Sequence, residues 1–191
     1  MLSTALTFLL TTVLNLITLL FLLRFFMQLF KAPFNNPLGY MVVSLTDFAV
    51  KPARKVIPSW GKIDLSTLLL AFITQLLLQL SLLWLRDFPL SVAGQSAWLG
   101  LIAMSVLGLL RTAIDVFFYA IMLQVILSWV NPHSPISGVL NSLTRPLLAP
   151  IQRFLPTAGG IDFSPIVALI LLQMINVSVV KTLEIQLLSF F

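Results

Sequence analysis

Long apolar runs alternate with short polar stretches along this chain. Residues 2–30 and 65–85 are apolar almost throughout, and so are residues 97–130 and 163–183. Each run reaches or exceeds the ~20 apolar residues that a helix needs to cross a bilayer. The pattern therefore predicts an all-α membrane protein with about four transmembrane helices.

The run at 97–130 also fits a second interpretation, in which it forms two spans that break near Arg111 and the chain crosses the membrane five times. Residues 109–113 include no glycine, proline or asparagine to form such a turn. Moving residues 100–128 back by 98 positions superimposes them on 2–30, the first predicted span. We therefore favour one span here and keep five spans as the alternative.

Polar and apolar positions follow helical spacing in residues 36–58, between the first two predicted spans. A polar stripe with a basic end, opposite an apolar face, is typical of a helix that lies in the membrane interface. Asn36 is expected to cap this helix, and Pro52 to bend or break it near Val50. The stripe consists of Ser44, Asp47, Lys51, Arg54 and Lys55.

Residues 134–156 repeat this arrangement after the third predicted span. Ser134 precedes a proline, as Asn36 does, and is expected to cap the second amphipathic helix. Pro146 and Pro150 are expected to bend it. The polar stripe here consists of Asn141, Arg145, Gln152 and Arg153.

A tandem repeat underlies this similarity. Residues 46–66 and 144–164 align with an offset of 98 positions and share a proline, proline, Gly-x-Ile-Asp-x-Ser pattern. The shared residues are Pro52, Pro58, Gly61 and Asp64 in the first copy and Pro150, Pro156, Gly159 and Asp162 in the second. We therefore predict two repeats, 1–96 and 97–191, each with an amphipathic segment between two membrane helices.

The motif and its duplication resemble the YggT family of small bacterial membrane proteins, which has relatives in chloroplasts. The resemblance covers nearly the whole chain, although the first copy has Trp-Gly-Lys where the second has Ala-Gly-Gly. It implies a bacterial inner-membrane protein without an established biochemical activity. It also implies links to osmotic-stress tolerance and ion homeostasis and, through relatives, to cell division, membrane organisation or cytochrome complex biogenesis.

Composition supports the membrane class. Hydrophobic residues make up 59% of the 191 and charged residues only 9%, whereas a soluble domain carries about 25% charged residues. The mean hydropathy is +1.07. The chain has no cysteine, which excludes disulfides, thiolate metal sites and a catalytic thiol.

Positive charges gather on one side of the predicted membrane. Arg86 and Lys181 fall on the other side, and Arg24, near the end of the first span, is expected to extend to the headgroups. The positive-inside rule therefore predicts that both motif copies face the cytoplasm and that both termini lie outside. The basic residues on the motif side are Lys31, Lys51, Arg54, Lys55, Lys62, Arg145 and Arg153.

Few residues offer chemistry. The chain carries none of the common nucleophile, metal-ligand or phosphate-loop motifs, so we expect neither an enzyme nor a cofactor or bound metal. His133, the one histidine, lies in a predicted turn. Asp64 and Asp162 begin predicted helices, where they either cap them, as we favour, or form a carboxylate pair for a cation.

Arg111 and Asp115 are charged residues inside the third predicted span, four positions apart. A charge inside a span is costly and suggests a function unless it is paired. The two residues either neutralise each other and lock helix packing, or serve as an ion or proton relay.

These features predict a non-enzymatic scaffold or assembly factor that binds anionic lipids or membrane and cytoplasmic proteins. The basic residues expected to make that contact are Lys51, Arg54, Lys55, Arg145 and Arg153. The alternative is a small transporter or channel component, which would be a homo-oligomer because four helices are few for a transport path. No nucleic-acid partner is expected.

Overall fold

The computed structural model describes residues 2–61, 63–89, 94–155 and 162–187. Helices account for nearly all of these residues. They are α1 (Leu2–Leu29), α2 (Pro37–Val56), α3 (Leu65–Leu85), α4 (Gly94–Val130), α5 (Ser137–Phe154), α6 (Ser164–Ile175), the π-helical η1 (Asn176–Val180) and α7 (Lys181–Leu187).

Four helical stretches are long and apolar enough to cross a membrane: α1, α3, α4 and the continuous α6–η1–α7 segment. This confirms the predicted all-α membrane fold. The helix α4 runs unbroken through Arg111, so the turn that five spans would need is absent. The five-span alternative is therefore wrong, because nothing in the sequence around Arg111 stops a helix.

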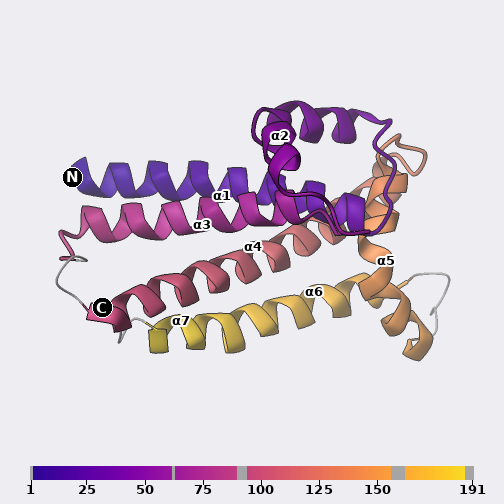
Figure 1. The fold of residues 1–191 in the computed structure, drawn as a ribbon. Helices are drawn as coiled ribbons and strands as arrows, with labels where there is room; N and C mark the ends of the chain where they lie inside the picture. The colour runs from indigo at the N-terminus through magenta and orange to yellow at the C-terminus, as the bar shows by residue number, and fades with distance from the viewer. Residues whose placement is uncertain (1, 62, 90–93, 156–161, 188–191) are drawn as a thin grey trace.

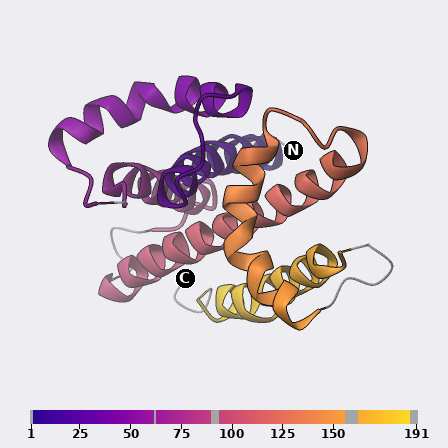
Figure 2. The same ribbon diagram turned by 90° about the vertical axis from the view of Figure 1, so that its right-hand side faces the viewer.

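The long helices lie side by side, and α2 and α5 lie at one end of them (Figure 1). The N-terminus and the end of α7 lie at the opposite end. Within the bundle α1 packs chiefly against α3, and α4 contacts every other helix except α2. Viewed from the end, α2 and α5 cross the ends of the long helices in separate places (Figure 2).

The buried core joins the two predicted repeats. One cluster contains Met27 of α1, Val42 of α2, Ala120 of α4 and Leu143 of α5. An aromatic contact adds to this packing, because the rings of Phe26 and Phe117 are tilted against each other with their centroids 4.7 Å apart. The two repeats therefore share one core at the end where α2 and α5 pack.

The start of α2 follows the expectation from the sequence. Asn36 Oδ1 accepts a hydrogen bond from the Gly39 backbone N–H at 2.9 Å, and Pro37 occupies the first turn. A Cβ on Gly39 would lie 2.3 Å from the Phe34 carbonyl oxygen, so only glycine fits there. The helix continues through Pro52 and curves, without the break near Val50 that the sequence also allowed (Figure 2).

The start of α5 differs from the expectation. Ser134 does not cap this helix, which begins at Ser137 with Ile136 as its N-cap residue and no side-chain cap. The Ser137 backbone N–H donates to the Ser134 carbonyl at 3.0 Å, so Ser134 belongs to the preceding turn. That turn contains two prolines, and the helix begins two residues later than the start of α2 moved forward by 98 positions.

Candidate functional site

A buried arginine connects α1 to α2. Arg24 is only 5% exposed, and its Nη1 donates to Thr46 Oγ1 at 2.6 Å and to Asp47 Oδ1 at 2.8 Å. Lys51 Nζ lies 2.8 Å from Asp47 Oδ2. Hydrogen bonds from Lys51 and Arg24 hold the pKa of Asp47 below its usual value. The expectation that Arg24 extends to the headgroups is wrong, because α2 supplies a carboxylate that binds it inside the protein.

A second ion pair connects α2 to the start of α3. Asp64 is fully buried, and its Oδ2 accepts from Arg54 Nε at 3.2 Å and from Arg54 Nη2. Arg54 Nη2 also donates to Gln28 Oε1 of α1 at 2.9 Å. Asp64 Oδ1 caps α3 by accepting from the Thr67 backbone N–H at 3.4 Å. Arg54 and Asp64 together thus connect α1, α2 and α3.

The environment of Asp64 contains opposing effects on its ionisation. Burial raises the pKa of this carboxyl, but hydrogen bonds from Arg54 and Thr67 outweigh burial and leave the pKa below its usual value. Because Asp64 is already capped and ion-paired, its oxygens are occupied by protein donors. The geometry agrees with the capping interpretation rather than with a free carboxylate awaiting a cation.

The motif loop between α2 and α3 is held by its own polar groups. Ser66 Oγ donates to the Ile57 carbonyl at 2.6 Å, and Trp60 and Ile63 exchange backbone hydrogen bonds at 3.0 Å. Gly61 has a φ of +61°, a conformation that L side chains rarely adopt. The recurring glycine, aspartate and serine of this copy therefore form a structural turn into α3.

The second repeat makes related contacts with neutral side chains. Thr144 Oγ1 donates to Gln124 Oε1 of α4 at 2.5 Å, and Gln124 Nε2 donates to Asn141 Oδ1 at 2.8 Å. Gln152 Nε2 donates to Asp162 Oδ2 at 2.8 Å. In the sequence alignment with an offset of 98 positions, Gln152 corresponds to Arg54 and Asp162 corresponds to Asp64.

Asp162 differs from its counterpart in exposure and partners. It is solvent-exposed, and its Oδ1 accepts from the Ser164 backbone N–H at 2.9 Å and from Ser164 Oγ at 2.6 Å. Burial raises the pKa of Asp162, and the bonds from Ser164 and Gln152 lower it further than burial raises it. We use the term clip for the two equivalent contacts, Arg54–Asp64 and Gln152–Asp162.

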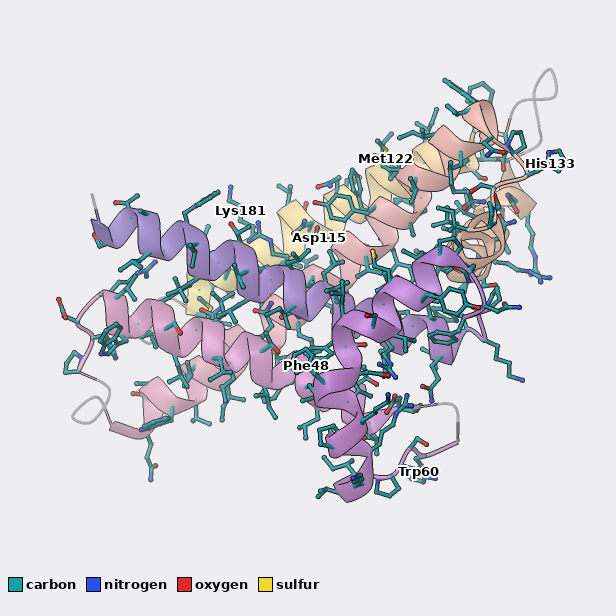
Figure 3. The ribbon with its side chains drawn as sticks, turned by 90° about the horizontal axis from the view of Figure 1, so that it is seen from above. Phe48, Trp60, Asp115, Met122, His133 and Lys181 are labelled. Carbon is teal, nitrogen blue, oxygen red and sulfur yellow. The ribbon has the colours of Figure 1, made fainter. Side chains whose placement is uncertain are left out.

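The remaining motif residues are structural where they are described. Pro52 lies inside α2, Pro150 inside α5, and Pro58 in the loop after α2. Trp60 lies at the tip of that loop, away from the long helices (Figure 3). Pro156 and Gly159 lie outside the described residues.

The predicted basic residues separate into two groups. Lys51 and Arg54 are ion-paired within the protein. Lys55, Arg145 and Arg153 are exposed and form no ion pair with any described residue. Arg145 and Arg153 line one surface hollow of about 510 Å³ on α5.

The intramembrane charges are arranged differently from the expectation. Arg111 Nη1 lies 3.5 Å from Glu184 Oε2 of α7, so its nearest ion-pair partner is not Asp115. Asp115, midway along α4 (Figure 3), forms no ion pair with the described residues. The sequence could not reveal Glu184 as the partner, because packing of α7 against α4 sets this contact.

No metal centre stands out in the described ranges. They contain no group of three or more histidine, cysteine, aspartate or glutamate side chains placed to hold a metal ion. His133 is exposed in the turn after α4 (Figure 3).

The fold and its two clips define a small all-helical membrane protein built from two tandem repeats. The family model described as CCB3/YggT matches residues 3–85 and again residues 103–183. The chain belongs to the CCB3/YggT family.

Several curated relatives extend over most of the chain. It is 40% identical over 180 residues to the uncharacterized protein YggT of Escherichia coli, a match that covers 94% of this chain and 91% of that protein. It is 38% identical over 184 residues to an uncharacterized protein of Pseudomonas aeruginosa, covering 95% of this chain and 91% of the relative. No solved structure matches the chain.

Proposed function

We propose that this protein is a non-enzymatic membrane-organising or assembly factor of the bacterial inner membrane. In this proposal α2 and α5 lie on the cytoplasmic leaflet, and the α5 hollow holds the headgroup of an anionic phospholipid. The excess of lysine and arginine on the motif side supports the cytoplasmic orientation. The family resemblance supports a link to osmotic-stress tolerance.

The observation that carries the proposal is the pairing of Arg145 and Arg153 at the α5 hollow. Both guanidinium groups are exposed and without an ion-pair partner among the described residues, and Asn141 lines the same hollow. Guanidinium groups bind phosphate oxygens with two parallel hydrogen bonds. A phosphate headgroup would therefore supply the negative charge that the protein does not provide there.

Large apolar side chains beside the basic residues support a position in the interface. Phe48 of α2 is 72% exposed, Phe154 of α5 is 84% exposed and Trp60 is 81% exposed. An interfacial helix buries such side chains at the boundary between headgroups and acyl chains. Tryptophan is also enriched at this depth.

Lipid titration of the full-length protein in detergent tests the proposal. Phosphatidylglycerol should bind more tightly than phosphatidylcholine, measured by native mass spectrometry. Each basic residue near an anionic surface contributes about 1 kcal/mol, so Arg145→Gln with Arg153→Gln should weaken phosphatidylglycerol binding about 10- to 30-fold.

The matched control, Lys181→Gln, removes a cation that the proposed orientation places on the other side of the membrane, and should bind phosphatidylglycerol as the wild type does. Equal affinity for both lipids, or an equal loss in the double variant and in the control, would contradict the proposal. A different outcome would be that the wild type shows no lipid preference, while Arg145→Gln with Arg153→Gln abolishes binding of a cytoplasmic protein. That result would assign the hollow to a protein partner instead.

A further inference from the structure

A second, larger cavity lies inside the helix bundle, away from α2 and α5. It has a volume of about 690 Å³, is partly open to the surface, and is lined by residues of α1, α3, α4 and the η1–α7 segment. Arg86, which caps the end of α3, is part of its wall. The cavity therefore extends from the C-terminal end of α3 toward the middle of α4.

The amide of Gln75 forms part of the cavity wall, and its carbonyl oxygen accepts no hydrogen bond from the described residues. Gln75 of α3 is 1% exposed, and its Nε2 donates to Asn15 Oδ1 at 3.0 Å and to Thr112 Oγ1 at 3.3 Å. Its Oε1 accepts no hydrogen bond from the described residues. Because Gln75 lines the cavity, this carbonyl can accept a hydrogen bond from a ligand there.

Gly108 of α4 makes room for that carbonyl. A Cβ at this position would lie 2.5 Å from Gln75 Oε1 and 3.1 Å from Gln75 Cδ. Any larger residue would therefore displace the amide. Because Gly108 also lines the cavity, the glycine and the amide act together in shaping its wall.

The charged and aromatic groups of the cavity wall come from one stripe along α4. Arg111, Asp115 and Tyr119 are spaced four residues apart, lie on one face, and all line the cavity. Successive members are about 6 Å apart along the helix axis, at a rise of about 1.5 Å per residue. The stripe presents a cation, an anion without an ion-pair partner among the described residues, and an aromatic ring.

The π-helical turn η1 sets the last part of the wall. A π turn adds a residue to the helix and changes the direction of the side chains that follow it. Val180 closes η1 and lines the cavity, and Glu184 follows one turn later, 3.5 Å from Arg111. Both side chains of this pair are substantially exposed, 55% for Arg111 and 40% for Glu184, so Arg111 stays accessible.

We propose that this cavity binds a small zwitterion, with its anionic group at Arg111 and its ammonium group between Asp115 and the ring of Tyr119. A carboxylate and an aromatic face are the usual partners of an ammonium group. The unused Gln75 carbonyl accepts a further hydrogen bond. Two sources have this chemistry: a free zwitterionic solute and the headgroup of a zwitterionic phospholipid. The α5 hollow, by contrast, presents only cations.

Binding of two probes to the full-length protein in detergent tests this proposal and separates the sources. The free probe is glycerophosphoethanolamine, measured by equilibrium dialysis, and the lipid probe is phosphatidylethanolamine, measured by native mass spectrometry. Saturable binding of the free probe assigns the cavity to a solute. Selective retention of phosphatidylethanolamine alone assigns it to a lipid headgroup.

The variants should act through charge. Asp115→Asn and Arg111→Gln should each weaken binding by about tenfold or more, since hydrogen bonds to charged groups are among the strongest. The matched controls Asp87→Asn and Lys181→Gln lie outside the cavity wall and should bind as the wild type does. Tyr119→Leu, at a residue that is 57% exposed, should fold and should weaken binding about threefold.

Three results would overturn the proposal. The first is that neither probe binds saturably. The second is that phosphatidylglycerol is retained as tightly as phosphatidylethanolamine. The third is that the variants Asp115→Asn and Tyr119→Leu, both monodisperse and helical, bind like their controls.

Discussion

Each repeat connects its amphipathic helix to the aspartate before the next membrane helix, but the two contacts differ in charge and in burial. In the first repeat the clip is an ion pair on a fully buried aspartate, Asp64, with Arg54 as donor. In the second repeat the donor is the neutral Gln152, and Asp162 is exposed. A polar contact at the start of a membrane helix thus persists while its charge and burial change.

The difference extends to the surface that each repeat presents. In the first repeat Asp47 binds both the buried Arg24 and the exposed Lys51, so its single negative charge offsets part of the positive charge of the two. The position equivalent to Asp47 is Arg145 in the second repeat, and the position equivalent to Arg24 is Met122. The second repeat therefore lacks the internal acid and keeps exposed arginines, which is why the proposed lipid site lies on α5.

The largest expected effect comes from removing the charge of the buried clip. Asp64→Asn keeps an oxygen that can cap α3 but removes the ion pair, so we expect a loss of about 2 kcal/mol in the free energy of unfolding. Arg54 is partly exposed and regains some hydration, which limits the loss. Reversible unfolding in mixed micelles measures it.

Asp162→Asn is the matched variant in the second repeat and should cost only about 0.5 kcal/mol, because Asp162 is exposed and its partners are neutral. Equal losses in the two variants would show that burial does not distinguish the clips.

Lowering the pH should destabilise the folded protein through protonation of Asp64. The pKa of Asp64 is lowered in the folded protein, so its contribution is complete above the unfolded pKa of about 3.9 and is lost as the pH falls through the folded value. The free energy of unfolding should therefore decrease below about pH 4. In the variant Asp64→Asn the free energy of unfolding should decrease less steeply over that pH range. Part of the decrease should remain, because the pKa of Asp47 is also lowered in the folded protein. An unchanged slope would mean that Asp64 does not contribute.

Exchanging the donors of the two clips should have smaller effects than removing the carboxylate charge of Asp64. Arg54→Gln should cost about 1 kcal/mol, less than Asp64→Asn, because glutamine can still donate to the carboxylate as Gln152 does. Gln152→Arg should change stability by no more than about 0.5 kcal/mol, since the new ion pair would be exposed. The same unfolding measurement applies. A gain from Gln152→Arg as large as the loss from Arg54→Gln would indicate that position, not burial, decides the strength of the clip.

The sequence by itself determined the fold class. Apolar runs longer than ~20 residues leave a helix as the favoured way to satisfy backbone hydrogen bonds in a bilayer, so four spans followed from length and composition. Asn36 before Pro37 located the start of α2, because capping depends on neighbouring residues. The 98-residue offset also paired Asp64 with Asp162 before any contact was known.

The tertiary structure decided which charges are free. Arg24 and Arg54 are satisfied by Asp47 and Asp64, which are more than eight residues away in the chain and on other elements. Arg111 meets Glu184 rather than Asp115, four residues away, because α7 packs against α4. Helical spacing states which side chains share a face, but not which partner from another helix reaches that face. Pairing between distant helices depends on their packing, and the exposed arginines of α5 and the cavity beside Asp115 emerged only from that packing.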